Sequence, residues 1–572
     1  MNKSVVKFSL SRFFSIVLIA SLVACGGQND SSEQSTNSSA NQQQSAAANK
    51  KIGREYFLEL QEGQELAEEQ VLHKGNGAEV QTLDPHKAEG VPSSNVLRDL
   101  YEGLTSEAPT GEVIPGAAES WTLSDDGLVY TFKIRENAKW SNGDPLTAAD
   151  FEYGIKRSID PATLSKYAYI LAPIKNAEAI SSGNEVVANL GVKAIDDVTL
   201  EIQLKAPTPY FLGLLNHSST YPVHKASVEE YGDQFSRPGK MVSNGAYYLV
   251  DWVPQSHMIL DRNTHYWDNA DTIINRVYYY PIEDQSTGLK RYRANELDYT
   301  YELPYKQLTW IKENIPDELV IAPYLGVYYF GFNLTQPPFK DNFELRKALT
   351  LAIDREVITE RVTGAGEIPA YNFVPPVNNY TGQKPDWANW TQAERLAEAK
   401  KLYAAAGYTK DSPLTISIHY NTHENHKTIS TAVAAMWKQS LGVNVELLNQ
   451  EWKVFLETRK QKKETQVFRA GWIGDYNDPY TFSELMLSNS GLNDSAYYRD
   501  EYDALLAKAS VESDLGKRRL LLEEAERMMM SELPIMPIYH YVTKRVVKKH
   551  VGGFHPNIMD HHFTKDMFIV KH

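Results

Sequence analysis

Cysteine is almost absent from this sequence: Cys25 is the only one among 572 residues. One cysteine excludes an internal disulfide and a cysteine-rich metal cage, and its place near the start makes a thiolate nucleophile in the body of the protein impossible. Long apolar runs are also missing, because no stretch after the N-terminal segment approaches 18 consecutive apolar residues. The formal net charge of −15 argues against nucleic acid or an anionic lipid surface as a partner.

The common catalytic signatures are lacking as well. The sequence contains no Gly-x-Ser-x-Gly elbow, no His-Glu-x-x-His helix and no glycine loop that would cradle phosphate. His419, His423 and His426 have a spacing that can hold zinc, but no fourth ligand lies nearby in the sequence. We therefore expect neither a cofactor nor a metal.

The N-terminus carries an export signal. Lys3, Lys7 and Arg12 precede an apolar run from 13 to 23, which is too short to cross a bilayer stably. We therefore predict a signal peptide over 1–24. Leu-Val-Ala-Cys, ending at Cys25, resembles the lipobox of bacterial lipoproteins, which implies that Cys25 is lipidated.

Residues 25–51 consist largely of Ser, Asn, Gln, Ala and Gly, so we predict a disordered tether. The remaining roughly 520 residues suggest two or three domains. Thirty-four tyrosines and ten tryptophans suit a binding cleft, although they suit a large core equally well.

Strands and helices alternate between 412 and 474. We predict strands over 414–420, 443–448 and 467–472, separated by helices over 427–440 and 452–462. This alternation predicts an α/β fold with a parallel sheet. Ligands of such sheets bind beyond the carboxyl ends of the strands, which is where Asp475 lies.

The sequence from Arg469 to Pro479 has two readings. Its glycines and Trp472 indicate a backbone that another chain approaches closely, and Asp475 follows as an acid that can grip a small cation. The same residues are also compatible with a Gly/Asp/Pro turn that caps a core strand.

Several elements are predicted for the first half of the chain. They are a strand over 78–83, a helix over 94–101, a hairpin turn at 124–127 with a strand over 129–134, a strand over 193–204 and a helix over 207–215.

Long motifs then resemble a known family. The sequence "AESWTLSDDGLVYTFKIRENAKWSNGDPLTAADFEYGIKR" over 118–157 is similar to the extracytoplasmic solute-binding proteins (family 5) of peptide ABC importers, in particular the oligopeptide-binding proteins. The similarity continues at 244–282, 291–299, 332–356, 399–408 and 443–459. It extends from about residue 75 to 572.

The resemblance implies a two-lobed periplasmic-binding-protein fold of type II, with hinge crossings and an additional inserted domain. The implied domains are lobe I (52–101, 227–326 and 543–572), the inserted domain (102–226) and lobe II (327–542). It also implies a transport receptor without catalytic residues, whose partners are short peptides and the permease subunits of an ABC importer. We expect an exported monomer, periplasmic or on the cell surface, anchored to the membrane through Cys25. The alternative function is a peptide-acting hydrolase. Within the family, the alternatives are receptors for dipeptides, murein peptides or another small ligand.

The resemblance further implies the residues that bind the peptide. Asp475 would meet the peptide ammonium, Glu89 would line the cleft, and Gly471 would pair with the ligand backbone. Basic groups for the peptide carboxylate would be Arg459, Arg469 and His426. Aromatic cleft residues would be Trp452, Trp472, Tyr167, Tyr324, Tyr329 and Tyr541.

Overall fold

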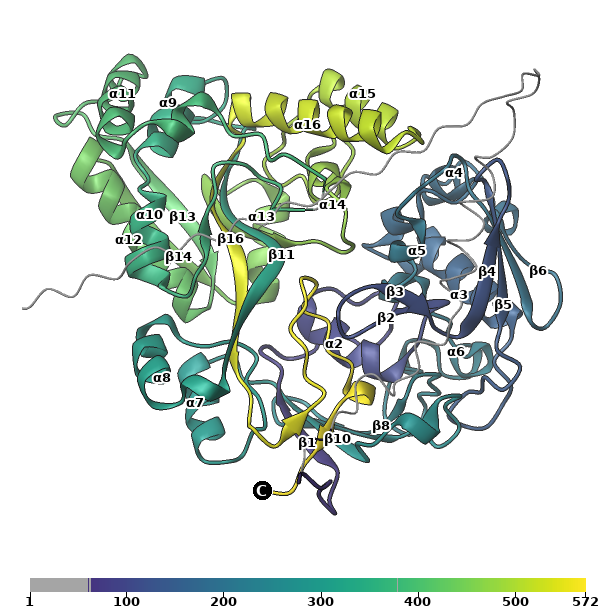
Figure 1. Cartoon of the computed structure of the whole chain (residues 1–572). Helices are drawn as coiled ribbons and strands as arrows, with labels where there is room; N and C mark the ends of the chain where they lie inside the picture. Colours follow the sequence, from purple (N-terminus) through teal and green to yellow (C-terminus); the bar gives the residue numbers. More distant parts are fainter. Residues whose placement is uncertain (1–59, 61–62, 378) are drawn as a thin grey trace, which may run out of the picture. The chain divides into compact units, whose positions relative to one another are not determined.

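A mixed six-stranded sheet organises the second half of the chain (Figure 1). Its strand order is β12-β16-β11-β15-β13-β14. The strands are β11 (Leu319–Phe332), β12 (Ile368–Pro369), β13 (Thr415–Asn421), β14 (Asn444–Gln450), β15 (Val467–Ile473) and β16 (Ile535–Val546). The computed structural model describes residues 60, 63–377 and 379–572, all of which belong to one compact unit.

The predicted alternation between 412 and 474 is confirmed. β13 pairs in parallel with both β14 and β15, and helices α12 (Glu424–Leu441) and α13 (Trp452–Gln461) form the crossovers. The sheet as a whole is mixed, because β15 runs antiparallel to β11 and β11 antiparallel to β16. Apolar residues of this sheet and its helices form one large buried cluster.

β11 and β16 are the longest strands, with 14 and 12 residues. They pair along their length, and the register shifts between Pro323 and Val327. In Figure 1 they run side by side from the region of α7 and α8 to the region of α9 and α16. The expected crossings at 326/327 and 542/543 lie within these two strands, whereas the expected boundary at 226/227 falls inside helix α6 (Lys225–Tyr231).

Two four-stranded sheets occupy the first half of the chain. Their orders are β1-β10-β9-β8 and β4-β5-β7-β6. The strands are β1 (Val71–Gly75), β4 (Ala118–Leu123), β5 (Val129–Ile134), β6 (Val192–Ala194), β7 (Thr199–Gln203), β8 (Tyr247–Val253), β9 (His257–Arg262) and β10 (Arg276–Tyr280). Both sheets contribute to a second buried apolar cluster, so the residues assigned to lobe I and to the inserted domain share a core.

The predictions for this half need three corrections. Residues 78–83 form no strand, because β1 occupies the place beside β10. The strand over 193–204 is a hairpin of β6 and β7, since the Asp196 carboxylate accepts the Val198 N–H (2.9 Å) and turns the chain. The helix over 207–215 is limited to α5 (Phe211–Leu214). The hairpin of β4 and β5 and the helix near 94–101, which is α2 (Val91–Leu100), are confirmed.

The remaining elements are short strands and covering helices. They are β2 (Thr105–Glu107), β3 (Val113–Pro115), β17 (Val551–Gly552), β18 (Phe568–Ile569), α3 (Ala148–Ile159), α4 (Ala177–Ser181), α7 (Gln285–Arg293), α8 (Leu308–Asn314), α9 (Phe343–Leu351), α10 (Arg355–Val357), α11 (Gln392–Ala405), α14 (Tyr480–Ser483), α15 (Asp500–Ala509) and α16 (Leu515–Glu532). No helix among the described residues has the length and apolar character needed to cross a membrane.

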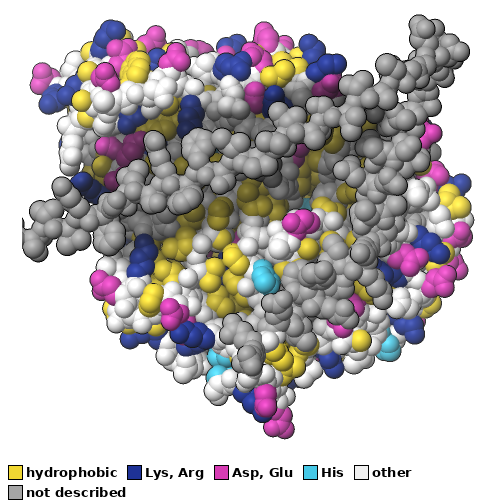
Figure 2. Space-filling model, viewed as in Figure 1, with side chains coloured by type: hydrophobic (Ala, Val, Ile, Leu, Met, Phe, Trp, Pro, Cys, Tyr) yellow, Lys and Arg dark blue, Asp and Glu magenta, His cyan; other side chains and the backbone are white. Residues whose placement is uncertain are grey.

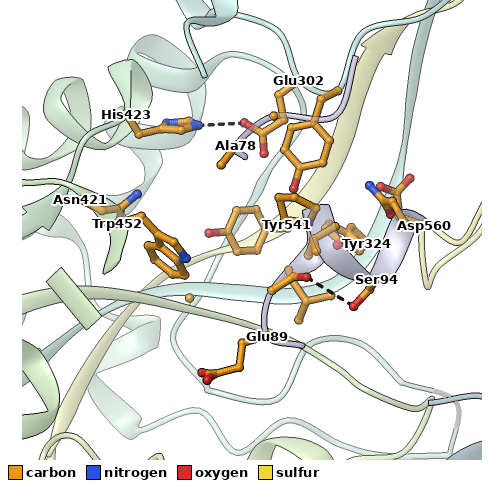
Figure 3. Close-up of a pocket in the computed structure, with 18 of the residues that line it drawn as sticks. Ala78, Glu89, Ser94, Glu302, Tyr324, Asn421, His423, Trp452, Tyr541 and Asp560 are labelled. Carbon is orange, nitrogen blue, oxygen red and sulfur yellow. Dashed lines mark hydrogen bonds and ion pairs between the residues drawn. The ribbon is translucent and has the colours of Figure 1, made fainter. Parts of the chain in front are cut away.

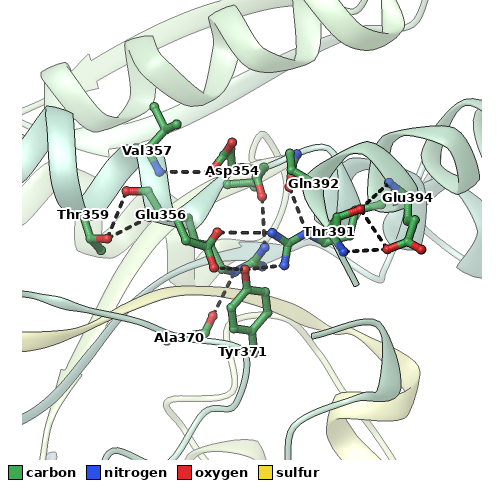
Figure 4. Close-up of polar contacts among 12 residues, drawn as sticks. Asp354, Glu356, Val357, Thr359, Ala370, Tyr371, Thr391, Gln392 and Glu394 are labelled. Atoms are coloured by element: carbon green, nitrogen blue, oxygen red, sulfur yellow. Dashed lines mark hydrogen bonds and ion pairs between the residues drawn. The ribbon is translucent and has the colours of Figure 1, made fainter. Parts of the chain in front are cut away.

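A fully buried arginine helps to hold the second half together. The Arg355 Nε donates to the carbonyl oxygens of Ala370 and Pro537, both at 2.8 Å. Nearby, Arg395 pairs with Glu356 (3.2 Å), and the Tyr371 hydroxyl donates to the same carboxylate (Figure 4). This Arg355 cluster therefore satisfies most of its own charges and donors.

Candidate functional site

One large cavity of about 610 Å³ collects residues from both halves of the chain. Eleven of the twelve predicted peptide-binding residues line it: Glu89, Tyr167, Tyr324, His426, Trp452, Arg459, Arg469, Gly471, Trp472, Asp475 and Tyr541. Tyr329 does not. Its ring is buried in the core and contacts Phe373 edge-on at 5.3 Å between ring centroids.

Aromatic side chains form much of the cavity wall. Figure 3 shows Trp452, Tyr541 and Tyr324 around a common open space. Trp452 is the first residue of α13, and Trp472 lies on β15. The rings of Tyr324 and Tyr541 contact edge-on, with 6.2 Å between their centroids. On the face in Figure 2, hydrophobic side chains likewise gather near the centre, and charged ones lie mostly around them. The aromatic walls suit apolar portions of a ligand.

Asp475 lies just beyond the end of β15. Its Oδ2 accepts a hydrogen bond from the Tyr169 hydroxyl (2.8 Å), and its backbone N–H donates to Thr481 Oγ1 (3.2 Å). It forms no ion pair with any Lys, Arg or His in the described part of the chain. Burial raises the pKa of Asp475 to about 7, and the Tyr169 hydrogen bond opposes this only in part. The cavity therefore contains a carboxylate that lacks a cation.

One edge of β15 is open over the residues before Asp475. β13 pairs with β15 only at Val467 and Phe468. On the other side, every residue of β15 pairs with β11. Gly474 N–H donates to the Leu325 carbonyl, so the even-numbered residues of β15 bond to β11. In a strand the alternate residues then direct their N–H and C=O groups to the other side. Residues 469, 471 and 473 present such groups at the open edge.

Gly471 is required by a close approach at this edge. A Cβ at this position would lie 2.7 Å from the Tyr541 hydroxyl and 3.1 Å from Arg469 Nη2. A side chain would therefore displace two groups of the cavity wall.

The two arginines of this region differ in their partners. Arg459 Nε lies 2.6 Å from Asp494 Oδ2, so its charge is neutralised by the protein. Arg469 is buried, donates to Tyr541 (2.8 Å) and stacks over Tyr328 (4.8 Å from its ring centroid). No carboxylate of the described residues forms an ion pair with Arg469. Of the two, Arg469 has the charge that is available to a ligand.

The fold does not bring His419, His423 and His426 together at one site. His423 and His426 line the cavity and stack at 4.1 Å between ring centroids, whereas His419 lies outside it. His423 Nε2 is 3.2 Å from Glu302, a contact visible in Figure 3. Burial opposes ionisation of Glu302, but the His423 hydrogen bond and nearby cations lower its pKa to about 2. Within the described ranges, no group of three or more His, Cys, Asp or Glu side chains has the arrangement of a metal site.

Glu89 and Tyr167 lie on the opposite half of the chain from β15. Burial raises the pKa of Glu89, and the charges of Lys166 and Lys460 act in the opposite direction. Tyr167 packs against His217 at 4.5 Å between ring centroids. Burial, together with the negative charges of Asp475 and Glu89, raises the pKa of the Tyr167 hydroxyl. Glu89 therefore has cations near it, in contrast to Asp475.

The sequence did not indicate three residues of the site: Glu302 and Arg98, which line the cavity, and Tyr169, which donates a hydrogen bond to Asp475. Tyr169 and Glu302 lie far from Asp475 and His423 in sequence, so only the tertiary fold reveals their contacts. Arg98 carried a weak signal, because it is a basic residue on the helix predicted near 94–101.

Comparisons with known proteins agree with this architecture. The sequence profile of bacterial extracellular solute-binding proteins, family 5 Middle, matches residues 112–494. The chain is 46% identical over 517 residues to the periplasmic oligopeptide-binding protein OppA of Escherichia coli (strain K12), covering 89% of this chain and 94% of that protein.

Solved structures give the same result. The murein tripeptide binding protein MppA of Escherichia coli is 41% identical, with a TM-score of 0.85 over 89% of this chain and 100% of that chain. The Haemophilus influenzae OppA complex with RPPGFSPFR is 40% identical, with a TM-score of 0.84 over 89% and 100%. The unliganded open form of MppA gives a TM-score of only 0.67 (41% identity, 90% and 99% covered). The conformation of this chain is therefore less similar to the open form of MppA than to the other MppA structure.

Proposed function

Because this chain belongs to family 5 of the bacterial extracellular solute-binding proteins, we propose that it captures short peptides in its cavity and delivers them to an ABC importer. The similarity to OppA of Escherichia coli and to the Haemophilus influenzae OppA complex with RPPGFSPFR supports peptides as the ligands. The cavity of about 610 Å³ has room for a short peptide and is lined by both halves of the chain.

The observation that carries the proposal is the unpaired carboxylate of Asp475. A charge enclosed away from water needs an opposite charge, and this part of the chain supplies none. A peptide ammonium is a cation of the right size, attached to a backbone that leads away from Asp475. Tyr169 would hold the carboxylate in place for it.

The open edge of β15 supports the rest of the binding mode. A peptide lying beside residues 469–473 would accept and donate main-chain hydrogen bonds as an added strand. Such bonds do not depend on the ligand sequence, so the receptor would accept many peptides. The segment from Tyr324 to Tyr329 would contribute on the other lobe, except that the Tyr329 side chain belongs to the core.

Arg469 is the proposed partner of the peptide carboxylate. Its guanidinium has no acid partner within the described ranges, and the nearby Arg459 already binds Asp494. His426 lies close to Arg469, but burial and that positive charge lower the pKa of His426 far below its ordinary value. A neutral His426 would act as a hydrogen-bond donor to the carboxylate.

The test is calorimetry on protein from which any bound ligand has been removed by unfolding and refolding. A tripeptide such as Ala-Ala-Ala should bind in a one-to-one complex, while free alanine should not. Mass spectrometry of the same mixture after prolonged incubation should return the intact tripeptide. Appearance of shorter products would favour the hydrolase, and absence of peptide binding would refute the receptor.

The anchor is a further part of the proposal. Cys25 lies outside the described residues, and its lipobox and tether precede the packed body. We expect Cys25→Ser to leave the tripeptide affinity unchanged and to release the protein from the membrane fraction into the soluble fraction. Stable retention of the Cys25→Ser variant in the membrane fraction would contradict lipidation as the anchor.

A further inference from the structure

Arg98 is a cation of the cavity wall that has no acid partner among the described residues. It lies on α2, is half-buried and donates from Nη1 to the Asn95 side chain (3.2 Å). A guanidinium has five N–H donors in a planar fork that matches a carboxylate. No carboxylate in the described part of the chain forms an ion pair with Arg98.

The surrounding acids already have partners. Glu107 contacts His561 and accepts from Asn216 (3.4 Å), and Glu102 pairs with Lys565 (3.0 Å). Asp560, also on the cavity wall, pairs with Arg545 and His562. The positive charge of Arg98 acts on Glu107 from a greater distance, but a closer anion is missing.

The neighbours of Arg98 form a polar recess. Asn95 lies beside it on α2, and Asn216, His217 and Tyr221 come from the segment that packs against this helix. Burial, reinforced by the charges of Arg98 and His561, lowers the pKa of His217 to about 3, so His217 is neutral at physiological pH. Arg98 also borders a small cavity of about 10 Å³, which has room for a single water. The recess thus offers donors and one fixed positive charge.

The cavity-wall arginines without an ion pair show what this recess lacks. Glu302 contacts His423, and Lys544 pairs with Glu367, so both have partners in the protein. Asp475 requires a cation and Arg469 an anion, and the two ends of a peptide supply both. Arg98 then remains as a second arginine without an acid partner in the described ranges, and a ligand with one carboxylate more than a neutral peptide would complement it. Glu89 does not cancel this excess, because Lys166 and Lys460 lie near it.

We propose that Arg98 is a specificity-determining residue that binds the side-chain carboxylate of an acidic residue in the peptide. The preferred cargo is then a short peptide with one Asp or Glu side chain in addition to its free ends. This inference rests on the proposed peptide-binding function, and it names the substrate class that the same cavity selects. The carboxylate would accept hydrogen bonds from the guanidinium N–H groups and from the side-chain amide of Asn95 or Asn216.

The test compares isosteric peptides, because Glu and Gln differ in charge and hardly in shape. Glu and Gln are placed in turn at each position of a tripeptide whose other residues are Ala, and the affinities are measured by calorimetry. At one position Glu should bind about tenfold to a few hundredfold more tightly than Gln, the scale of a charge-assisted hydrogen bond. In Arg98→Gln this preference should disappear, while the affinity for the Gln peptide stays within a few-fold.

Two further variants complete the experiment. Arg98→Lys keeps the charge and loses the planar fork, so it should retain part of the preference. Arg293→Gln removes one charge from an exposed position on α7 outside the cavity and should leave the preference intact. Binding of the Gln peptide by each variant also reports that the variant is folded.

Each outcome separates the inference from the proposed function. Equal affinities for Glu and Gln at every position of the wild type would overturn the inference while leaving a peptide receptor. A Glu preference that survives in Arg98→Gln, or that disappears in Arg293→Gln, would overturn the assignment to Arg98. Failure of every tripeptide to bind would instead refute the proposed function.

Discussion

The Arg355 cluster and the Asp475 end of the cavity both bury charge, but the first surrounds it with several hydrogen-bond partners and the second with few. Arg355 is fully buried and donates to backbone carbonyls at 2.8 Å, with Arg395 and Glu356 paired beside it (Figure 4). Asp475 accepts one hydroxyl hydrogen bond and forms no ion pair with a cation of the described residues. Burial lowers the pKa of Arg355 to about 10 and raises that of Asp475 to about 7.

The difference separates charges that serve the fold from charges that, under the proposed function, a ligand would pair. A buried group whose partners come from its own chain stabilises the native state when they are all present. A buried group without partners costs stability, and such groups concentrate at functional sites, where a ligand can supply the missing partner. By this criterion Arg459, which is paired with Asp494, belongs with Arg355, while Arg469 and Arg98 belong with Asp475.

The largest expected effect comes from breaking the Arg355 cluster. In Arg355→Met the carbonyls of Ala370 and Pro537 lose their donor, and further carbonyls near the guanidinium lose theirs. At about 1–3 kcal/mol for each buried group left unsatisfied, the free energy of unfolding should fall by about 3–5 kcal/mol. Urea denaturation measures this loss.

Peptide affinity should be unaffected in the same variant, because Arg355 does not line the cavity. Arg361→Met is the control, since Arg361 is exposed, and its stability should match the wild type. A variant of Arg355 that keeps its stability but binds peptide poorly would break the distinction between the two regions.

Asp475→Asn should behave in the opposite way. Removing one partner of a buried, hydrogen-bonded charge pair costs about 2–5 kcal/mol, which corresponds to a loss of roughly thirty-fold to a few thousand-fold in peptide affinity. The stability of the unliganded protein should not fall, because an isolated buried carboxylate is replaced by a neutral amide. Calorimetry gives the affinity and urea denaturation the stability.

A peptide acetylated at its amino terminus sharpens this test. Acetylation alone should reduce affinity by a similar factor, and the two changes should be strongly non-additive because they remove the same interaction. If the losses add, the ammonium lies elsewhere, and Glu89 is the next acid to examine. If Asp475→Asn has no effect while acetylation does, Asp475 is only part of a turn.

The sequence predicts the fold well where periodicity is strong. The alternation of β13, α12, β14, α13 and β15 could be predicted because each segment carries its own pattern of apolar residues. The structure of segment 78–83 could not be predicted, because pairing between the distant strands β1 and β10 decides which residues form the strand. The hairpin of β6 and β7 could not be predicted either, because it depends on one Asx turn at Asp196. Tyr329 was misplaced among the cavity residues because neighbouring tyrosines on β11 point to different sides.

The site shows the same division. Asp475 could be found because it directly follows a strand with two glycines, a local signal. Nothing local indicated that Asp494 neutralises Arg459 or that Arg469 and Arg98 lack such a partner. Whether a charge is satisfied depends on contacts between distant segments, and the structure is needed to see them.

The smallest expected effect is a dependence of binding on pH. Because the pKa of Asp475 is about 7 in the unliganded cavity, the carboxyl carries a proton below that pH and must release it to pair with an ammonium. Peptide affinity should therefore fall by about tenfold for each pH unit below 7. It should also fall above about pH 8, where the peptide amine loses its proton. Calorimetry in buffers of different ionisation enthalpy should detect one released proton at pH 6.

The sign for stability is the reverse of that for binding. The pKa of Asp475 is raised on folding, so its contribution to the free energy of unfolding is fully present below the unfolded value of about 4 and is lost as the pH rises through about 7. Glu89, Glu484 and Tyr169 also act near this site, and burial raises the pKa of each. Asp475→Asn isolates the contribution of Asp475: in this variant the acid limb of the affinity profile should be flat. An acid limb that persists in Asp475→Asn would assign the proton to Glu89 or Glu484, and Asp475 would then resemble the satisfied charges of the Arg355 cluster.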